Sequence, residues 1–415
     1  MELRKRDLAA CVAGNALEFY DFTTYAYFAV QIGAAFFPAQ DKFVSLMLTL
    51  LTFGASFIMR PIGAIVIGRY ADRVGRKPAM LLSFGLMGAG VFALAITPSY
   101  AQIGIVAPIT ILAIRLVQGF ALGGDVGPTT SFLIEAAPPE ARGFYGALQF
   151  TGQGLATVLA GIAGVLLASL LSVEQLAAFG WRIAFLFGVL VVPLGLIVRR
   201  NLPETLHPDT PKIPQDPSPR VWRIALLGLL SIMGSTTGFY VLAYMSTYAQ
   251  VVLHMKVNVS FAATLVFGVC NVVFSVIAGR ISDRVGRRPL MIWPRIAIIV
   301  LAYPAFLLIT TQTTAVTLLA ATATLAVFTQ SGGAVSLVWL TEALPARVRS
   351  ATMASVYAVG VALFGGTTQP IVTELLHVTG DKFAPAWWLI ATTFVCLAAT
   401  FFMEETAPAI TGRPD

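Results

Sequence analysis

Charged residues are scarce in this 415-residue sequence: they make up 11% of it, against 57% hydrophobic residues. Because a soluble globular domain carries about 25% charged residues, this scarcity excludes that class. Apolar runs of about 20 residues, long enough to cross a bilayer as helices, make up nearly the whole chain. The sequence therefore predicts an all-α protein with many membrane spans.

Cysteine and histidine are rarer still, with three residues of each. The cysteines lie inside apolar runs, where a thiol behaves as a small hydrophobic side chain, so we expect neither a disulfide nor a metal site. The histidines lie in or near loops, and the sequence shows no nucleophile–base pair, metal-ligand cluster or P-loop. We therefore expect no enzyme, no cofactor and no ATP-driven pump. These residues are Cys11, Cys270, Cys396, His207, His254 and His377.

The apolar runs divide into twelve predicted spans. The first follows a basic N-terminus and is interrupted by Asn15, Glu18 and Asp21 without a small-residue cleavage site, which indicates a retained helix and not a signal peptide. The predicted spans are 9–37, 45–68, 79–98, 103–135, 143–171, 181–200, 221–253, 258–280, 290–310, 313–342, 350–377 and 384–403.

A proline-rich segment, LPETLHPDTPKIPQDPSP at 202–219, separates spans six and seven. Six of its eighteen residues are proline, so it can neither form a helix nor cross lipid. It predicts a solvated cytoplasmic linker between two six-helix halves, residues 1–201 and 220–415.

The basic residues are distributed unevenly about the predicted spans. Twenty of the 27 lysines and arginines fall in loops on one side, four fall on the other, and three lie within spans. By the positive-inside rule, this asymmetry places both termini in the cytoplasm of a cell whose inner membrane holds the chain. It also explains the net charge of +7 without a nucleic-acid partner.

Two segments repeat between the halves in the same order. GRYADRVGRKP at 68–78 returns as GRISDRVGRRP at 279–289, identical at eight of eleven positions, and EAAPPEARG from Glu135 is echoed by EALPARVRS from Glu342. A parallel repeat of two six-helix units is typical of transporters that bind their substrate at the midplane between the halves. The repeated motif residues are Gly68, Asp72, Arg73, Gly75, Arg76 and Lys77, and Gly279, Asp283, Arg284, Gly286, Arg287 and Arg288.

These motifs predict a cytoplasmic gate. The first glycine lets a neighbouring helix approach closely and the second permits a tight turn, while the aspartate can pair with a base and with a helix N-terminus. Such charge-assisted pairs would latch the cytoplasmic side when it closes, with Glu135 and Glu342 as partners. The alternative is that the bases only set topology, which explains the arginines and lysines but not the repeated aspartate.

Ionisable residues within spans are the candidates for the transport site, because each costs about 2.5 to 3.5 kcal/mol on insertion scales. Arg115, near the middle of its span, can hold a carboxylate through two hydrogen bonds. Arg60 is the second candidate cation, and Glu18, Asp21 and Asp125 are the candidate proton carriers. The alternatives are that Arg115 makes a structural ion pair with Asp125 or a span-one acid, and that Arg60 only snorkels.

Uncharged polar side chains on the long apolar spans could line the path of the substrate. For each one alone, a hydrogen bond between helices is the stronger interpretation. The candidates for substrate contact are Asn15, Gln118, Gln149, Gln153, Tyr240, Tyr244, Gln330 and Ser331.

The paired loop motif resembles that of the major facilitator superfamily, and the match occurs twice, in the corresponding loops. Within it, GNALEFYDFTTYAYFA, FGASFIMRPIGAIVIGRYADRVGRKP and RLVQGFALGGDVG resemble the metabolite:proton symporter branch, and YAQIGIVAPITILAIRLVQGF is most similar to citrate and tricarballylate proton symporters. At Asp125 many branch members have glutamate. Asn15, Glu18, Asp21, Arg60, Arg115 and Gln118 match branch positions.

The resemblance implies the major facilitator fold and alternating access, with proton-coupled uptake of citrate or a related tricarboxylate, a small anionic carboxylate. The implied partners are protons and the lipid bilayer, and we expect a functional monomer. The same branch also carries dicarboxylates such as 2-oxoglutarate and zwitterions such as betaine and proline. A drug exporter of the same fold and a non-transporting membrane sensor are weaker alternatives.

Overall fold

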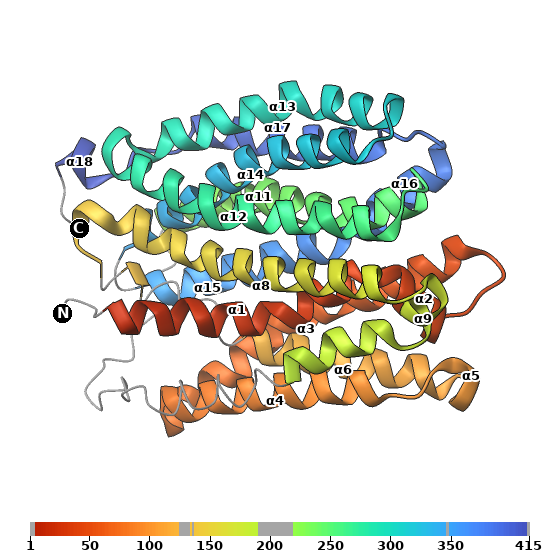
Figure 1. The fold of residues 1–415 in the computed structure, drawn as a ribbon. Coiled ribbons are helices and arrows are strands. Elements are labelled where there is room, and N and C mark those ends of the chain that lie inside the picture. The colour runs from red at the N-terminus through yellow and green to blue at the C-terminus, as the bar shows by residue number, and fades with distance from the viewer. Residues whose placement is uncertain (1–4, 124–132, 135–136, 190–218, 346–347, 413–415) are drawn as a thin grey trace.

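The computed structural model is a bundle of long helices that run side by side (Figure 1). It describes residues 5–123, 133–134, 137–189, 219–345 and 348–412. Every regular element in these residues is helical. This follows from the sequence, because an apolar run in lipid can satisfy its backbone groups within a single segment only as a helix.

The helices before the predicted linker cover the first six predicted spans. Residues 181–189 form the described start of the sixth. The labelled elements are α1 (Lys5–Tyr27), α2 (Ala29–Phe36), α3 (Lys42–Val74), α4 (Arg76–Ile96), α5 (Tyr100–Ile103), α6 (Val106–Gly123), η1 (Pro139–Ala141), α8 (Arg142–Leu170), α9 (Val173–Gln175) and η2 (Leu176–Gly180).

The helices after the predicted linker cover the last six predicted spans. The eleventh predicted span is divided into α15, a five-residue π-helix η3, and α16. The elements are α11 (Pro219–Val251), α12 (Val257–Val285), α13 (Arg287–Thr311), α14 (Ala315–Ala343), α15 (Arg349–Gly360), η3 (Val361–Gly365), α16 (Gly366–Thr379), α17 (Ala384–Phe401) and α18 (Pro408–Thr411).

Nine helices within the described ranges are long and apolar enough to cross a membrane. The three other predicted spans are helical as well: α1 and α2 cover 9–37, α4 covers most of 79–98, and a helix starts at residue 181. The predicted linker at 202–219 lies outside the described residues, apart from Pro219 at the start of α11.

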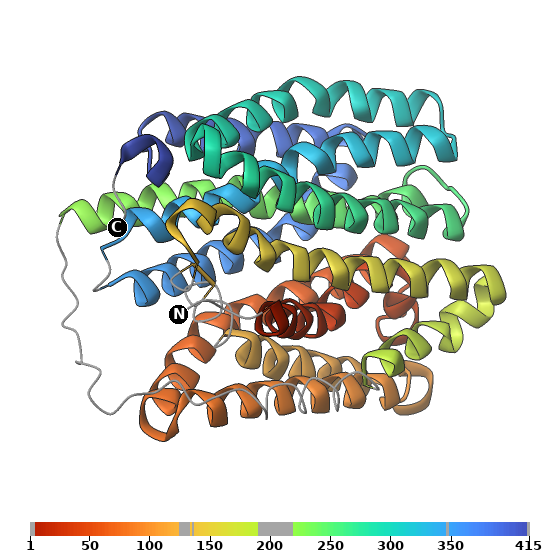
Figure 2. The same cartoon turned by 60° about the vertical axis from the view of Figure 1, so that its left-hand side comes forward.

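Helices 5–189 and helices 219–401 gather into two groups that meet along α8 and α12 (Figures 1 and 2). We call these groups the first and second halves. The two helices approach closely because glycines line the seam between them. A Cβ atom on Gly143 would lie 2.5 Å from the Gly279 carbonyl oxygen, and one on Gly161 would lie 2.8 Å from the Leu265 nitrogen.

The two repeated motifs form equivalent tight turns. Gly75 precedes α4 with φ of 117° and Gly286 precedes α13 with φ of 102°, values that favour glycine. Both turns lie at the same end of the bundle as the start of α1 and as α18 (Figure 1). We call this the motif end, and the other the opposite end.

The expected close helix approach at the first motif glycine is found in only one of the two repeats. Gly279 touches Gly143 of the other half, as above, whereas a Cβ on Gly68 would meet no described atom within 4 Å. The close approach is thus observed at Gly279, and at Gly68 it stays a prediction, because no described residue lies close enough to show it.

Candidate functional site

A cavity lies where the two halves meet. It encloses about 460 Å³ of space not filled by atoms, some of it open to solvent. The first half contributes Phe19, Phe150 and Gln153, and the second half contributes the rest of the wall. The second-half residues are Ile232, Ser235, Thr236, Phe239, Tyr240, Gly333, Ser336, Leu337, Tyr357 and Val361.

Arg115 forms an ion pair with a span-one acid in this structure. Its Nη1 donates to Asp21 Oδ2 at 2.8 Å and to Gln118 Oε1 at 2.8 Å, and the arginine is completely buried. Its guanidinium carbon lies 4.3 Å from the ring centre of Tyr25 and 4.6 Å from that of Phe22. The pair is incomplete, because Arg115 Nε and Nη2 and Asp21 Oδ1 make no hydrogen bond to any residue that the structure describes.

Arg60 does not snorkel to the membrane surface: it is 3% exposed. None of its three guanidinium nitrogens has a hydrogen-bond acceptor in the described part of the chain. The guanidinium carbon packs against Phe57 at 4.1 Å and Phe22 at 4.6 Å, measured to the ring centres. The polar group beside this cation is the hydroxyl of Tyr240, which lines the cavity, although its geometry is not that of a hydrogen bond.

Two of the predicted polar residues bind each other across the first half. Asn15 Nδ2 donates to the Gln149 carbonyl oxygen at 2.5 Å, and Gln149 Nε2 donates to Asn15 Oδ1 at 3.3 Å. This is the helix-to-helix hydrogen bond offered as the alternative to substrate contact. Gln153, one turn further along α8, instead lines the cavity, and its buried Nε2 makes no hydrogen bond to a described residue.

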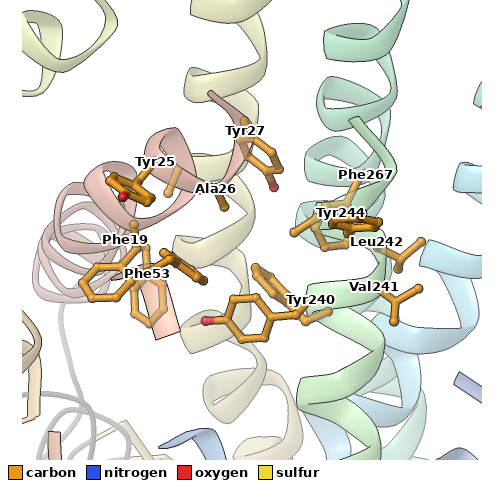
Figure 3. Packing of buried hydrophobic residues seen from close by; sticks show 14 of the residues in the cluster. Phe19, Tyr25, Ala26, Tyr27, Phe53, Tyr240, Val241, Leu242, Tyr244 and Phe267 are labelled. Atoms are coloured by element: carbon orange, nitrogen blue, oxygen red, sulfur yellow. The ribbon is translucent and has the colours of Figure 1, made fainter. Parts of the chain in front are cut away.

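Only some of the predicted substrate-contact residues of the second half line the cavity. Tyr240 reaches from α11 toward Phe53 of α3, and their ring centres lie 6.0 Å apart (Figure 3). Tyr244 accepts a hydrogen bond from Thr373 at 2.9 Å and is not among the cavity-lining residues. Gln330 and Ser331 also lie away from the lining, and the Ser331 hydroxyl donates to the Val327 carbonyl.

The span-one acids face a second, smaller cavity inside the first half. This space of about 280 Å³ is lined by Glu18 and Asp21 of α1, together with residues of α4 and the helix that starts at 181. Asp21 thus lies between this cavity and Arg115. Asp125, the third proposed proton carrier, lies outside the described residues.

The second loop motif joins the two halves at the motif end. Asp283 accepts hydrogen bonds from the backbone N–H groups of Gly143 at 2.7 Å and Phe144 at 3.0 Å, which are the first turn of α8. A carboxylate at a helix N-terminus is stabilised by the unpaired N–H groups and by the helix dipole. The Arg280 guanidinium also lies over the Phe144 ring, 4.6 Å from its centre.

Arg287 holds this carboxylate in place. Its Nη1 bonds Asp283 at 2.8 Å, while Nε and Nη2 bond the two oxygens of Glu342 at 3.0 and 2.8 Å. Glu405 accepts from the backbone N–H groups of Arg287 and Arg288 at the start of α13. Arg284 and Arg73 are exposed, which fits a role in topology.

The corresponding network of the first motif cannot be described in the same way. Glu135 lies outside the described residues, as do the side chains of Asp72, Arg76 and Lys77. The described motif-end network therefore consists of the second motif, Glu342, Glu405 and the start of α8.

Contacts between the halves also close the opposite end. Gln31 Nε2 of α2 donates to Gln250 Oε1 of α11 at 3.1 Å, and the Phe28 and Phe261 ring centres lie 4.7 Å apart. The central cavity is thus bounded by contacts between the halves at both ends.

Some residues of these networks were not singled out from the sequence. Tyr357 and Ser336 line the cavity, and Glu405 completes the motif-end network. From the sequence alone, a tyrosine or serine on an apolar span looks like an ordinary core residue. Glu405 follows the last predicted span, where an acid is ordinary, so only its contact with α13 distinguishes it.

Comparison with known proteins identifies the family. Residues 12–365 match the Major Facilitator Superfamily. The chain belongs to this superfamily. It is therefore a multi-pass membrane transporter and not an enzyme.

Sequence relatives within the Major Facilitator Superfamily cover nearly the whole chain. A citrate-proton symporter of Salmonella typhi is 36% identical over 398 residues, covering 94% of this chain and 91% of that one. A proline/betaine transporter of Salmonella typhimurium is 30% identical over 425 residues, covering 98% of this chain and 84% of that one.

Solved structures confirm the major facilitator fold. A D-xylose-proton symporter matches with a TM-score of 0.77 at 18% identity, covering 98% of this chain and 99% of that one. A human organic anion transporter, MFSD10, matches with a TM-score of 0.62 at 17% identity, covering 96% and 99%.

Proposed function

We propose that this protein is a proton-coupled symporter that takes up citrate or a related tricarboxylate by alternating access. The observation that carries the proposal is Arg60, a buried cation that makes no hydrogen bond within the described residues and lies beside the cavity-lining Tyr240. A buried cation of this kind is costly unless an anion completes its coordination. The 36% identical citrate-proton symporter supports the same class of substrate.

Proton coupling is assigned to the pair of Arg115 and Asp21. A substrate carboxylate that takes the free Nε and Nη2 donors of Arg115 weakens the bond to Asp21. Once released in a low-dielectric site, the Asp21 carboxylate favours its neutral form and binds a proton. Loss of the substrate on the other side of the membrane returns Arg115 to Asp21 and expels that proton, so one solute and one proton move together. Glu18, in the same small cavity, is the adjacent proton carrier.

The orientation follows from the motif end. We assign this end to the cytoplasm of a bacterial cytoplasmic membrane, because the excess of basic loop residues lies there. Asp283, Arg287 and Glu342 then form the cytoplasmic gate, an assignment supported by the bonds of Asp283 to the start of α8 and to Arg287 and by the bond of Arg287 to Glu342. The unit that transports is a monomer, because the cavity is built within one chain.

The nearest alternative is a symporter of zwitterions such as betaine or proline, named among the relatives. An aromatic cage for a quaternary ammonium needs free ring faces. Here Arg60 covers Phe22 and Phe57, and Arg115 covers Phe22 and Tyr25. Because the protein's own cations occupy these rings, the arrangement favours an anion. A symporter of dicarboxylates such as 2-oxoglutarate would use the same cations, and only the charge of its substrate would differ.

The test is uptake of radiolabelled citrate by the purified protein in proteoliposomes. An imposed pH gradient, acidic outside, should drive accumulation above the external concentration, and a protonophore should abolish it. Unlabelled citrate, 2-oxoglutarate and betaine are then compared as competitors. Accumulation driven by sodium alone would refute proton coupling, and competition by betaine but not citrate would refute the substrate class.

A further inference from the structure

Arg295 is a buried cation of the second half that no ion pair explains. It lies on α13 and is 3% exposed. Its Nη2 donates to Ser231 Oγ and to Ser336 Oγ, each at 2.7 Å, and its Nη1 bonds Thr400 Oγ1. All three partners are neutral hydroxyls, and within the described ranges Arg295 has no acidic partner.

Such an arrangement satisfies the hydrogen bonds of the guanidinium but leaves its charge uncompensated. Hydroxyl dipoles offset only part of the cost of removing a cation from water, and an arginine at membrane depth otherwise pairs with an acid. The other two cations inside the membrane differ: Arg115 pairs with Asp21, and Arg60 belongs to the first half. Arg295 therefore brings positive charge to the second half.

One of the three hydroxyls connects Arg295 to the central cavity. Ser336 lines the cavity, whereas Ser231 and Thr400 do not. The Ser336 hydroxyl accepts from Arg295 and donates to the Gly332 carbonyl at 2.7 Å. Since a serine hydroxyl rotates freely and has two lone pairs, it can turn its proton into the cavity while it still accepts from Arg295. The hydrogen-bonded pair of Arg295 and Ser336 then presents a polarised O–H donor to an anion.

We propose that Arg295, acting through Ser336, recognises one carboxylate of a polycarboxylate held in the central cavity and sets the preference for three carboxylates over two. This inference rests on the proposed function and adds a positioning residue from the second half. The substrate lies between Arg60 of the first half and the Arg295–Ser336 pair of the second. A polycarboxylate bound in this way contacts both halves, so its binding favours the closed arrangement of the cavity.

The experiment compares two serines that make the same bond to Arg295 at the same distance. Ser336→Ala removes the hydroxyl that lines the cavity, and Ser231→Ala is the matched control that removes one that does not. The probes are tricarballylate and glutarate, which differ by a single carboxylate on the same three-carbon chain. For each variant the ratio of the two KM values is measured in proteoliposomes, together with the amount of inserted protein.

Ser336→Ala should raise KM for tricarballylate about tenfold relative to glutarate, the typical effect of one hydrogen bond to a charged group. Ser231→Ala should leave the ratio within about twofold. Arg295→Met should shift the ratio in the same direction as Ser336→Ala, and Arg295→Lys should restore most of it. A purely structural role predicts equal effects of the two serine variants on KM for both probes.

Equal effects of Ser336→Ala and Ser231→Ala would overturn the inference, and so would an unchanged ratio in Ser336→Ala. The serine pair decides the question even if Arg295→Met fails to reach the membrane. A wild-type protein that transports betaine or proline but neither probe would refute the proposed function and this inference together. A wild-type protein that transports tricarballylate, with a ratio unmoved in Ser336→Ala, would refute this inference alone.

Discussion

Arg115 and Asp21 share a single 2.8 Å hydrogen bond, although an arginine and a carboxylate can form two. The second carboxylate oxygen and two guanidinium nitrogens are buried and make no hydrogen bond in the described part of the chain. An ion pair kept for stability alone would use both bonds, since a buried unpaired polar group costs about 1 to 3 kcal/mol. The half-formed pair leaves donors free for a substrate, and it can be exchanged.

Replacing Arg115 by alanine should abolish citrate uptake while the protein remains in the membrane. The variant loses the two free donors and leaves Asp21 without its cation, so we expect uptake to fall at least about 100-fold, the loss typical of a charge-assisted bidentate contact. The measurement is initial uptake normalised to inserted protein. Arg182→Ala is the control, because Arg182 is half-buried and bonds the Thr97 carbonyl, far from the cavity. Normal uptake by Arg115→Ala would remove this arginine from the site.

Replacing Asp21 by asparagine should separate exchange from accumulation. Asparagine keeps an oxygen that accepts from Arg115 but has no carboxylate to protonate. Citrate counterflow between equal concentrations should stay within about threefold of wild type, whereas accumulation driven by a pH gradient should vanish. Glu174→Gln, an exposed acid, is the control. Uphill accumulation that persists in Asp21→Asn would show that another residue carries the coupling proton.

Removing the carboxylate of Asp283 should open the motif end. Asp283→Ala leaves the first N–H groups of α8 and Arg287 without their partner, a loss of about 1 to 3 kcal/mol from the closed state. In a protein without native cysteines, a thiol introduced by Ser235→Cys in the cavity wall should react faster with a reagent added from the motif end. Arg284→Ala removes an exposed neighbouring charge and should change nothing. Equal reaction rates in both variants would argue against the latch.

The two first-motif glycines should respond differently to the same substitution. Gly279→Val introduces a Cβ 2.5 Å from the Gly143 carbonyl, so overpacking should destabilise the protein by about 1 to 3 kcal/mol and lower its Tm in detergent by several degrees. Gly68→Val adds a side chain that meets no described atom within 4 Å of its Cβ and should leave Tm nearly unchanged. Equal losses of Tm would show that Gly68 is packed as closely as Gly279.

Much of the fold follows from the sequence, because hydropathy and the repeated motif depend on local patterns. The turns at Gly75 and Gly286 and the helical spans are where the patterns place them. The contact between Gly279 and Gly143 could not be predicted, since it depends on how the first half lies against the second motif.

The candidate site is less predictable for a related reason. The sequence identifies Arg60 and Arg115 as buried cations but not which one has a partner, because that depends on the direction of α1 and α3 side chains. Only the structure shows which polar residues line the cavity and which bind another helix. Gln153 lines the cavity, whereas Gln149 is bonded to Asn15. Their spacing along α8 carries no information about this difference.

The glycine seam between α8 and α12 affects how fast the two halves can move relative to each other. Where large side chains interlock, parting two helices requires each side chain to find a new rotamer and leaves a void behind. Backbone resting on backbone, as at Gly143 and Gly279, presents a nearly smooth surface that can slide or separate with little rearrangement. Movement at this part of the interface therefore requires little side-chain rearrangement, whereas the polar contacts of Asp283 and Gln31 and the aromatic contact of Phe28 with Phe261 must break when the halves separate there.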